Sequence, residues 1–175
     1  FEYSSGFTYN GTNLNLAAGN GIAFGGTRYL HADATNDSIA FGEYAGATFG
    51  VGTTHNVALG FEAGRYASTS DADENNYIGR QAGYNNTGGT NNLFGAYAGY
   101  GNTGFFNNML GQNAGAENTG AYNILIGGLA GYGNIGGNNV FVGELAGRDN
   151  EGDDGVFLGT SAGQNNTGSF SNMFG

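Results

Sequence analysis

Residues 76–95, NYIGRQAGYNNTGGTNNLFG, contain one complete unit of the repeat that decides the fold of this chain. A glycine closes a short apolar run at Gly79 and again sixteen residues later at Gly95. We call the glycines at this position the ruler glycines: Gly42, Gly60, Gly79, Gly95, Gly111, Gly127, Gly143, Gly159 and Gly175. A period this strict indicates one structural unit stacked on itself. Function is therefore expected on a surface of equivalent residues rather than in a single pocket.

Two apolar residues precede every ruler glycine, and their pattern predicts a short strand. The residue directly before the glycine is bulky: Phe41, Leu59, Ile78, Phe94, Leu110, Ile126, Val142, Leu158 and Phe174. The residue before that is also apolar, as in Leu93, Met109, Leu125, Phe141, Phe157 and Met173. Successive side chains of a strand point to opposite faces. We therefore expect one face to fill the coil and the other to be covered by a partner, because an exposed apolar column promotes aggregation.

The rest of the repeat consists of residues that favour turns. Ala-Gly follows each ruler glycine up to Gly159, as in Ala82-Gly83, and Asn-Thr-Gly recurs, as in Asn86-Thr87-Gly88. Glycine and asparagine both tolerate left-handed backbone conformations. Asparagine also recurs four residues before the ruler glycine, and stacked asparagines can form amide ladders. The sequence predicts an all-β parallel β-solenoid of 16-residue coils, each with two short strands and two corners.

The first part of the chain departs from this pattern. Two longer steps between ruler glycines place extra residues in Thr48–His55 and Tyr66–Glu74, which we expect to be loops that leave the strands in register. We expect the solenoid to span residues 37–175, with a cap in residues 1–36. That cap would hold a terminal strand pair around Asn10-Gly11 and one degenerate coil at Gly21–Gly25.

Composition excludes several classes of protein. The 175 residues suit one domain, and the net charge is −10. The only cations are four arginines, so the chain lacks a stripe that could neutralise nucleic-acid phosphates. The absence of cysteine excludes disulfides and thiolate metal sites. No apolar run is long enough to span a membrane. Because the chain lacks an initiating Met and stops within a repeat, we expect it to be a mature or excised segment.

The residues do not suggest an enzyme. His31 and His55 share no repeated spacing, and no serine lies in a nucleophile elbow. Two acidic segments, one with Asp71, Asp73 and Glu74 and one from Asp149 to Asp154, match no calcium-binding motif. We interpret them as solvated charge, with a calcium site as the alternative. We expect no other cofactor.

Three further features could carry recognition. One column, five residues after the ruler glycine, contains tyrosines suited to stacking on sugar rings and two arginines: Tyr84, Tyr100, Tyr132, Arg65 and Arg148. Packing against a neighbouring coil or chain is the alternative for these residues. The inserted loops Thr48–His55 and Tyr66–Glu74 could bind a ligand or lock neighbouring chains together. A column of threonines could match an ordered surface such as ice, although Ile135 and Glu151 interrupt it: Thr87, Thr103, Thr119 and Thr167.

The repeat resembles the head repeats of trimeric autotransporter adhesins, which also occur in phage tail-fibre proteins. Asn56-Val57-Ala58-Leu59-Gly60 followed by Ala63-Gly64 carries this resemblance, and residues 7–16 are similar to a segment of phage fibres. The resemblance implies a left-handed β-roll that trimerises, although the period of sixteen differs from the usual fourteen of the adhesins. It implies a non-enzymatic, extracellular segment of a virion fibre or a bacterial surface adhesin that contacts a host glycan or protein. A self-assembling filament and an ice- or surface-binding protein are the alternatives.

Overall fold

The structure is a computed structural model that describes residues 7–9, 14–16, 21–24, 27–33, 37–49, 53–67 and 71–175. The described residues form strands and turns and contain no helix. The strands are β1 (Phe7–Tyr9), β2 (Leu14–Leu16), β3 (Gly21–Phe24), β4 (Thr27–Asp33), β5 (Ser38–Phe41), β6 (Val57–Leu59), β7 (Asn76–Ile78), β8 (Asn92–Phe94), β9 (Asn108–Leu110), β10 (Ile124–Ile126), β11 (Val140–Val142), β12 (Val156–Leu158) and β13 (Asn172–Phe174).

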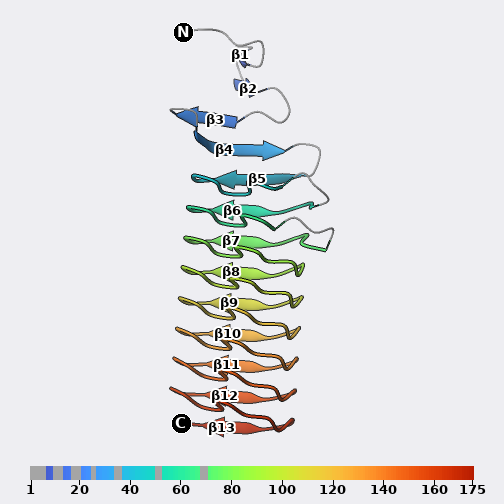
Figure 1. Ribbon diagram of the computed structural model, residues 1–175, viewed down its shortest axis with the longest axis vertical. Helices are drawn as coiled ribbons and strands as arrows, with labels where there is room; N and C mark the ends of the chain where they lie inside the picture. The colour runs from blue at the N-terminus through green and yellow to red at the C-terminus, as the bar shows by residue number, and fades with distance from the viewer. Residues whose placement is uncertain are drawn as a thin grey trace.

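Strands β3 to β13 form one eleven-stranded sheet in chain order, and the coils stack along the long axis of the molecule (Figure 1). From β5 to β13 each strand pairs in parallel with the next. Leu93 pairs with Met109, which in turn pairs with Leu125, so residues sixteen apart share a register. The predicted parallel β-solenoid with 16-residue coils is confirmed.

Each regular coil contains one strand, so the prediction of two strands per coil is wrong. The segment expected to be the second strand is bent rather than extended. In the coil that begins at Gly79, the Asn86 side chain donates a hydrogen bond to the carbonyl of Gly88, and Thr90 has a φ of 57°. Local bonds from side chain to backbone compete with strand formation, and here they turn the chain back toward the next strand.

The N-terminal strands pair in antiparallel fashion. β1 pairs with β2, which confirms the predicted terminal strand pair. The predicted degenerate coil at Gly21–Gly25 is wrong, because β3 pairs antiparallel with β4 and β4 pairs antiparallel with β5. The sequence after Gly25 lacks the Ala-Gly pair that turns the chain in the coils. Strand β4 thereby covers the edge of β5, the first parallel strand, and an edge paired in this way is closed to further pairing.

Glycine is required at two positions of the corner after each strand. At the ruler glycine Gly111, φ is +138° and an added Cβ would lie 2.5 Å from the carbonyl oxygen of Gly127 in the next coil. At Gly99, in the Ala-Gly pair, φ is +60° and an added Cβ would lie 2.5 Å from Cδ1 of Leu93. Only glycine adopts the φ of Gly111 without strain, whereas a φ near +60° also occurs at non-glycine residues such as Tyr97. At both positions only glycine leaves this space empty. The glycine period therefore follows from close contact between successive coils and between corner and core.

The inner face of the sheet fills the coil. Leu93, Leu125 and Phe141 are fully buried, and the Phe141 ring stacks on that of Phe157 with centroids 4.7 Å apart. In the first two coils alanine takes this inner position, at Ala40 and Ala58. The residue seven after Gly42 is Phe49, whereas the coil after Gly60 has Ala67 there and the coils from Gly79 onward have asparagine. The buried Phe49 ring packs against that of Tyr77, with centroids 6.1 Å apart. Phe49 thus fills interior space beside the small inner residues of the first two coils.

Two ladders of buried asparagines run through the interior and confirm the expected amide ladders. In the corner ladder, each side-chain amide donates to the side-chain oxygen of the preceding coil, as Asn118 does to Asn102 at 2.8 Å. In the strand-entry ladder, each side-chain oxygen accepts a backbone N–H from the next coil, as Asn91 does from Asn107 at 2.8 Å. The corner ladder contains Asn86, Asn102, Asn118, Asn134, Asn150 and Asn166. The strand-entry ladder contains Asn56, Asn75, Asn91, Asn107, Asn123 and Asn139.

The longer spacings leave the strands in register, as predicted. Ala40 in β5 pairs with Ala58 in β6, and Ala58 pairs with Tyr77 in β7. Several described residues of the two inserted loops are buried, among them Phe49, Ala67 and Ala72. The predicted contribution of these loops to binding also falls on residues 50–52 and 68–70, which lie outside the described residues.

Candidate functional site

The predicted column of tyrosines and arginines lies on the corner that follows each strand. Arg65, Tyr84 and Tyr100 occupy equivalent positions after β6, β7 and β8, because each lies five residues after a ruler glycine. Tyr132 and Arg148 continue the column after β10 and β11. We call this surface the tyrosine face and include the aromatic and basic residues that contact the column: Tyr44, Arg65, Tyr66, Tyr84, Tyr97, Tyr100, Tyr132 and Arg148.

The structure brings these side chains together in two groups. The Tyr84 and Tyr100 rings stack with centroids 5.2 Å apart and an angle of 1° between their planes, and Tyr66 packs edge-on against Tyr84. The Arg148 guanidinium lies 5.8 Å from the ring centroid of Tyr132. In the intervening coil the equivalent residue is Ala116, so the column is interrupted between Tyr100 and Tyr132.

Arg65 is fixed in the first group by several contacts. It forms an ion pair with the buried Glu62, donates a hydrogen bond to the Tyr66 hydroxyl, and lies over the rings of Tyr44 and Tyr66. Desolvation acts to lower the pKa of Arg65, but the hydrogen bond to Glu62 and the nearby Tyr66 outweigh it, so the pKa lies above its ordinary value. Arg65 therefore serves as a permanent positive charge held between aromatic rings, a cation–π arrangement.

The hydroxyls of Tyr84 and Tyr132 stay protonated well above neutral pH. Desolvation raises the pKa of Tyr84, and desolvation together with the Glu117 carboxylate raises the pKa of Tyr132. The nearby Glu117 side chain thus favours the protonated form of the Tyr132 hydroxyl. Both tyrosines can therefore act as neutral hydrogen-bonding groups.

Four residues beside the column were not predicted from the sequence: Gln81, Tyr97, Asn113 and Glu117. Together with Tyr84, Tyr100, Ala116 and Tyr132 they line a surface cavity. Gln81, Tyr97 and Asn113 each lie two residues after a ruler glycine and have positive φ values between 54° and 61°. That recurrence was visible in the sequence, but residue types vary at this position and gave no chemical signal.

A second surface is the outer side of the parallel sheet. The bulky residue before each ruler glycine points away from the interior, and several of these side chains are exposed; Leu110, for example, is 53% exposed. We call this column the apolar face: Phe41, Leu59, Ile78, Phe94, Leu110, Ile126, Val142, Leu158 and Phe174. The column beside it, three residues before each ruler glycine, contains only asparagine and β-branched residues, and Asn76, Asn92 and Asn108 form a further amide ladder there. The apolar face therefore runs along the parallel coils without a charged residue.

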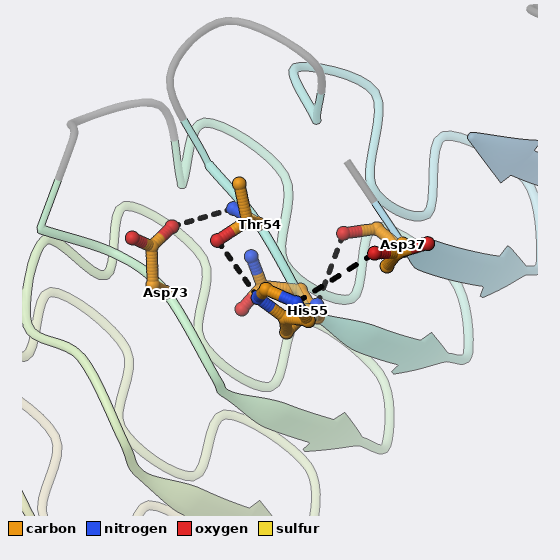
Figure 2. Close-up of polar contacts among 6 residues, drawn as sticks. Asp37, Thr54, His55 and Asp73 are labelled. Atoms are coloured by element: carbon orange, nitrogen blue, oxygen red, sulfur yellow. Dashed lines mark hydrogen bonds and ion pairs between the residues drawn. The ribbon is translucent and has the colours of Figure 1, made fainter. Parts of the chain in front are cut away.

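The side chain of His55 belongs to an exposed series of polar contacts that links neighbouring coils (Figure 2). Nε2 of His55 lies 3.7 Å from a carboxylate oxygen of Asp37, and its Nδ1 lies 3.0 Å from the Thr54 hydroxyl. Asp73 accepts a hydrogen bond from the Thr54 backbone N–H. The side chains of His55 and Asp37 are 58% and 72% exposed, so these contacts connect loop corners at the surface. His31 lies in β4, and its side chain is outside the described part of the structure.

Two described acidic side chains accept backbone hydrogen bonds from neighbouring coils. Besides Asp73, Asp153 accepts a bond from the N–H of Gly137 at 2.7 Å. Within the ranges that the structure describes, no three acidic or histidine residues lie together as a metal-binding group. The alternative of calcium binding is left without support from geometry.

The threonine column lies on the part of each coil that leads from the corner to the next strand, which we call the return segment. Thr103, Thr119 and Thr167 are exposed, but the equivalent residue is Ile135 in one coil and Glu151 in the next. The column therefore offers at most three consecutive threonines, in Thr87, Thr103 and Thr119. A surface this narrow is a weak match for an extended lattice.

The fold and its surfaces define the chain as a parallel β-solenoid repeat protein with one aromatic and one apolar surface. Compared with protein-family models, with curated proteins and with solved structures, the chain matches none. Across the described ranges, the structure has no helix with the length and apolar character of a membrane span.

Proposed function

We propose that this chain is a rigid, non-enzymatic segment of an extracellular fibre and that it works as a homotrimer. It would form the shaft or the receptor-binding part of a phage tail fibre or of a bacterial surface adhesin. The resemblance of the repeat to adhesin head repeats supports this role and implies left-handed winding. The observation that carries the proposal is the charge-free apolar face, which extends over nine parallel strands.

The apolar face favours a second rod of the same kind as its partner. Full burial of a leucine or phenylalanine side chain contributes about 1.5–3 kcal/mol. Because Leu110 and Leu158 are already partly covered within one chain, each coil has roughly 1 kcal/mol left to gain. That gain recurs with every coil, so it is largest for a partner that has the same repeat and runs along the whole rod. Copies of this chain meet that requirement.

The interior explains how such a rod would remain stiff. Some backbone N–H groups of each coil bond to the following coil and others to the preceding coil, as Gly99 does to Ala114 and Gly101 to Tyr84. The two buried asparagine ladders add side-chain hydrogen bonds along the same axis. Each coil is therefore fixed to both neighbours by directional bonds, and added coils lengthen the rod without loosening it.

A charge placed on the apolar face tests the proposal. We expect Leu110→Lys to convert trimers to monomers while each chain remains folded, because the side chain lies on the outer side of the sheet and the charge would be buried only in the assembly. Thr119→Lys is the matched control, since it adds the same charge at an exposed position on the return segment. Mass by sedimentation equilibrium and fold by circular dichroism are measured for both. A Leu110→Lys protein as fully trimeric as the control would contradict the proposal.

A further inference from the structure

The interruption of the tyrosine column creates a slot in the surface. The residue five after the ruler glycine is tyrosine at Tyr84, Tyr100 and Tyr132 but alanine at Ala116. The cavity on this face includes Ala116, Tyr100 and Tyr132 in its lining, and the Ala116 side chain is only 3% exposed, so neighbouring side chains cover most of it. Alanine takes less room than the tyrosine at the equivalent positions, and the cavity lies at this interruption of the column. We call this cavity the tyrosine slot.

The spacing of the coils sets the width of the slot. Tyr100 and Tyr132 lie two coils apart, and a strand spacing of about 4.8 Å makes two coils about 9.6 Å. A ring at the level of Ala116 would then lie about 4.8 Å from each tyrosine, within the roughly 4.5–7 Å at which stacked rings pack. Tyr84 and Tyr100, in adjacent coils, already stack at 5.2 Å. This coil spacing would let a single six-membered ring stack between Tyr100 and Tyr132.

The rim of the slot is polar. Asn113 and Tyr97 are among the residues that line the cavity. Their side chains form no hydrogen bond to another described residue, so both can bond to a ligand. The Glu117 carboxylate lies at the same rim and interacts with Tyr132. Aromatic walls with a few polar groups around them suit a ligand with an apolar face and a polar edge. A negative charge at the rim disfavours an anionic ligand.

We propose that the tyrosine slot binds one neutral pyranose ring of a glycan, held between Tyr100 and Tyr132. A pyranose presents C–H groups on its faces to the aromatic walls and hydroxyls at its edge to Asn113, Tyr97 and Glu117. An aromatic side chain bound in the slot would stack on the same two rings but would leave these polar groups without hydrogen-bond partners. The inference rests on the proposed function, since it names the ligand class that a receptor-binding rod would recognise.

Filling the slot with the residue of the neighbouring coils is the test. Ala116→Tyr places a tyrosine where Tyr84, Tyr100 and Tyr132 already fit, so we expect the rod to stay folded with the stack complete. Ala47→Tyr is the matched control, because Ala47 has the equivalent position in the first coil and lies outside the cavity. The probes are the methyl glycosides of glucose, galactose, mannose and N-acetylglucosamine, with methyl β-D-glucuronide as the anionic analogue. Binding is followed by saturation-transfer NMR and by tyrosine fluorescence, which no tryptophan obscures in this chain.

We expect at least one neutral glycoside to bind with a Kd on the order of 1 mM, as is reasonable for a single small ring. Ala116→Tyr should weaken that binding at least tenfold and Ala47→Tyr should leave it unchanged, while the glucuronide binds at least tenfold more weakly than the glucoside. If Ala116→Tyr does not fold, Tyr132→Ala removes one wall and should cause the same loss. Unchanged binding in the slot variant, equal binding of the glucuronide, or no saturable binding of any neutral glycoside would overturn the proposal.

The same samples separate this inference from the proposed function. A trimer that binds none of the glycosides would overturn the slot assignment and leave the fibre role standing. A monomer that binds a neutral glycoside and loses it in Ala116→Tyr would overturn the trimer and leave the slot standing. The mass of each sample is therefore measured beside its titration.

Discussion

Removal of one rung from the corner ladder should destabilise the rod strongly. The Asn118 side chain donates to Asn102 Oδ1 at 2.8 Å and to the carbonyl of Gly120 at 2.7 Å, and it accepts a bond from Asn134 at 2.8 Å. Asn118→Ala abolishes all three bonds and leaves one buried N–H of Asn134 without an acceptor. An unsatisfied buried group costs about 1–3 kcal/mol and each lost bond about 0.5–1.5 kcal/mol, so we expect a loss of about 3–4 kcal/mol. For a domain of this size, that lowers the Tm by about 10 °C.

The control is the same substitution in the last coil. Asn166 donates to Asn150 Oδ1 at 2.8 Å and to the carbonyl of Gly168 at 2.6 Å, but no other asparagine among the described residues donates to it, and it is only partly buried. Because water can replace its bonds, we expect Asn166→Ala to cost about 1 kcal/mol. Thermal unfolding followed by circular dichroism at one fixed protein concentration compares the two variants. Equal losses would refute the claim that the ladder stabilises the rod through its buried interior.

Two further predictions concern the corner and the core. Gly111→Ala should prevent stable folding, because the new Cβ would lie 2.5 Å from a carbonyl oxygen. Gly101 has a φ of +66° and no neighbour within 4 Å of an added Cβ, so Gly101→Ala should lower the unfolding free energy by only about 1 kcal/mol. Urea unfolding measures both variants, and similar losses would contradict the steric argument. Complete burial raises the pKa of Tyr77 far above its ordinary value of 10.0, so the unfolded chain loses this proton first and stability must fall as the pH rises above about 10. Tyr77→Phe should remove that part of the pH dependence, as seen in urea unfolding at pH values on both sides of 10; an unchanged slope would show that other tyrosines cause it.

The period of the ruler glycines was sufficient to predict the parallel coils and their register. It also predicted the amide ladders, because the side chains of a buried column of asparagines can find hydrogen-bond partners in one another only along the stack. The second strand was predicted wrongly, because the sequence alone does not show that Asn86 bonds to Gly88 and bends the return segment. The coil expected at Gly21–Gly25 failed because an apolar run between glycines occurs equally in an antiparallel strand.

The candidate site was only partly predictable. The tyrosine column followed from a fixed offset after each ruler glycine, and the structure places its members on one face. The slot at Ala116 depends on the absence of a tyrosine from one position of that column. It also depends on Tyr97 and Asn113, which lie two rather than five residues after a ruler glycine and which the corner brings beside the column. Pairwise stacking, burial and the orientation of the Glu117 carboxylate are consequences of the three-dimensional corner, which a one-dimensional pattern does not contain.

The mass of the protein in solution decides between a trimeric fibre segment and a single rod. One chain has a mass of 17.9 kDa, so the trimeric fibre segment predicts a species of about 54 kDa in sedimentation equilibrium. Small-angle scattering of the same sample should show a straight rod, as expected of a solenoid whose coils stack along one axis (Figure 1). A single species of 17.9 kDa at every concentration tested would contradict the account, because the apolar face would then be exposed to water in the working protein.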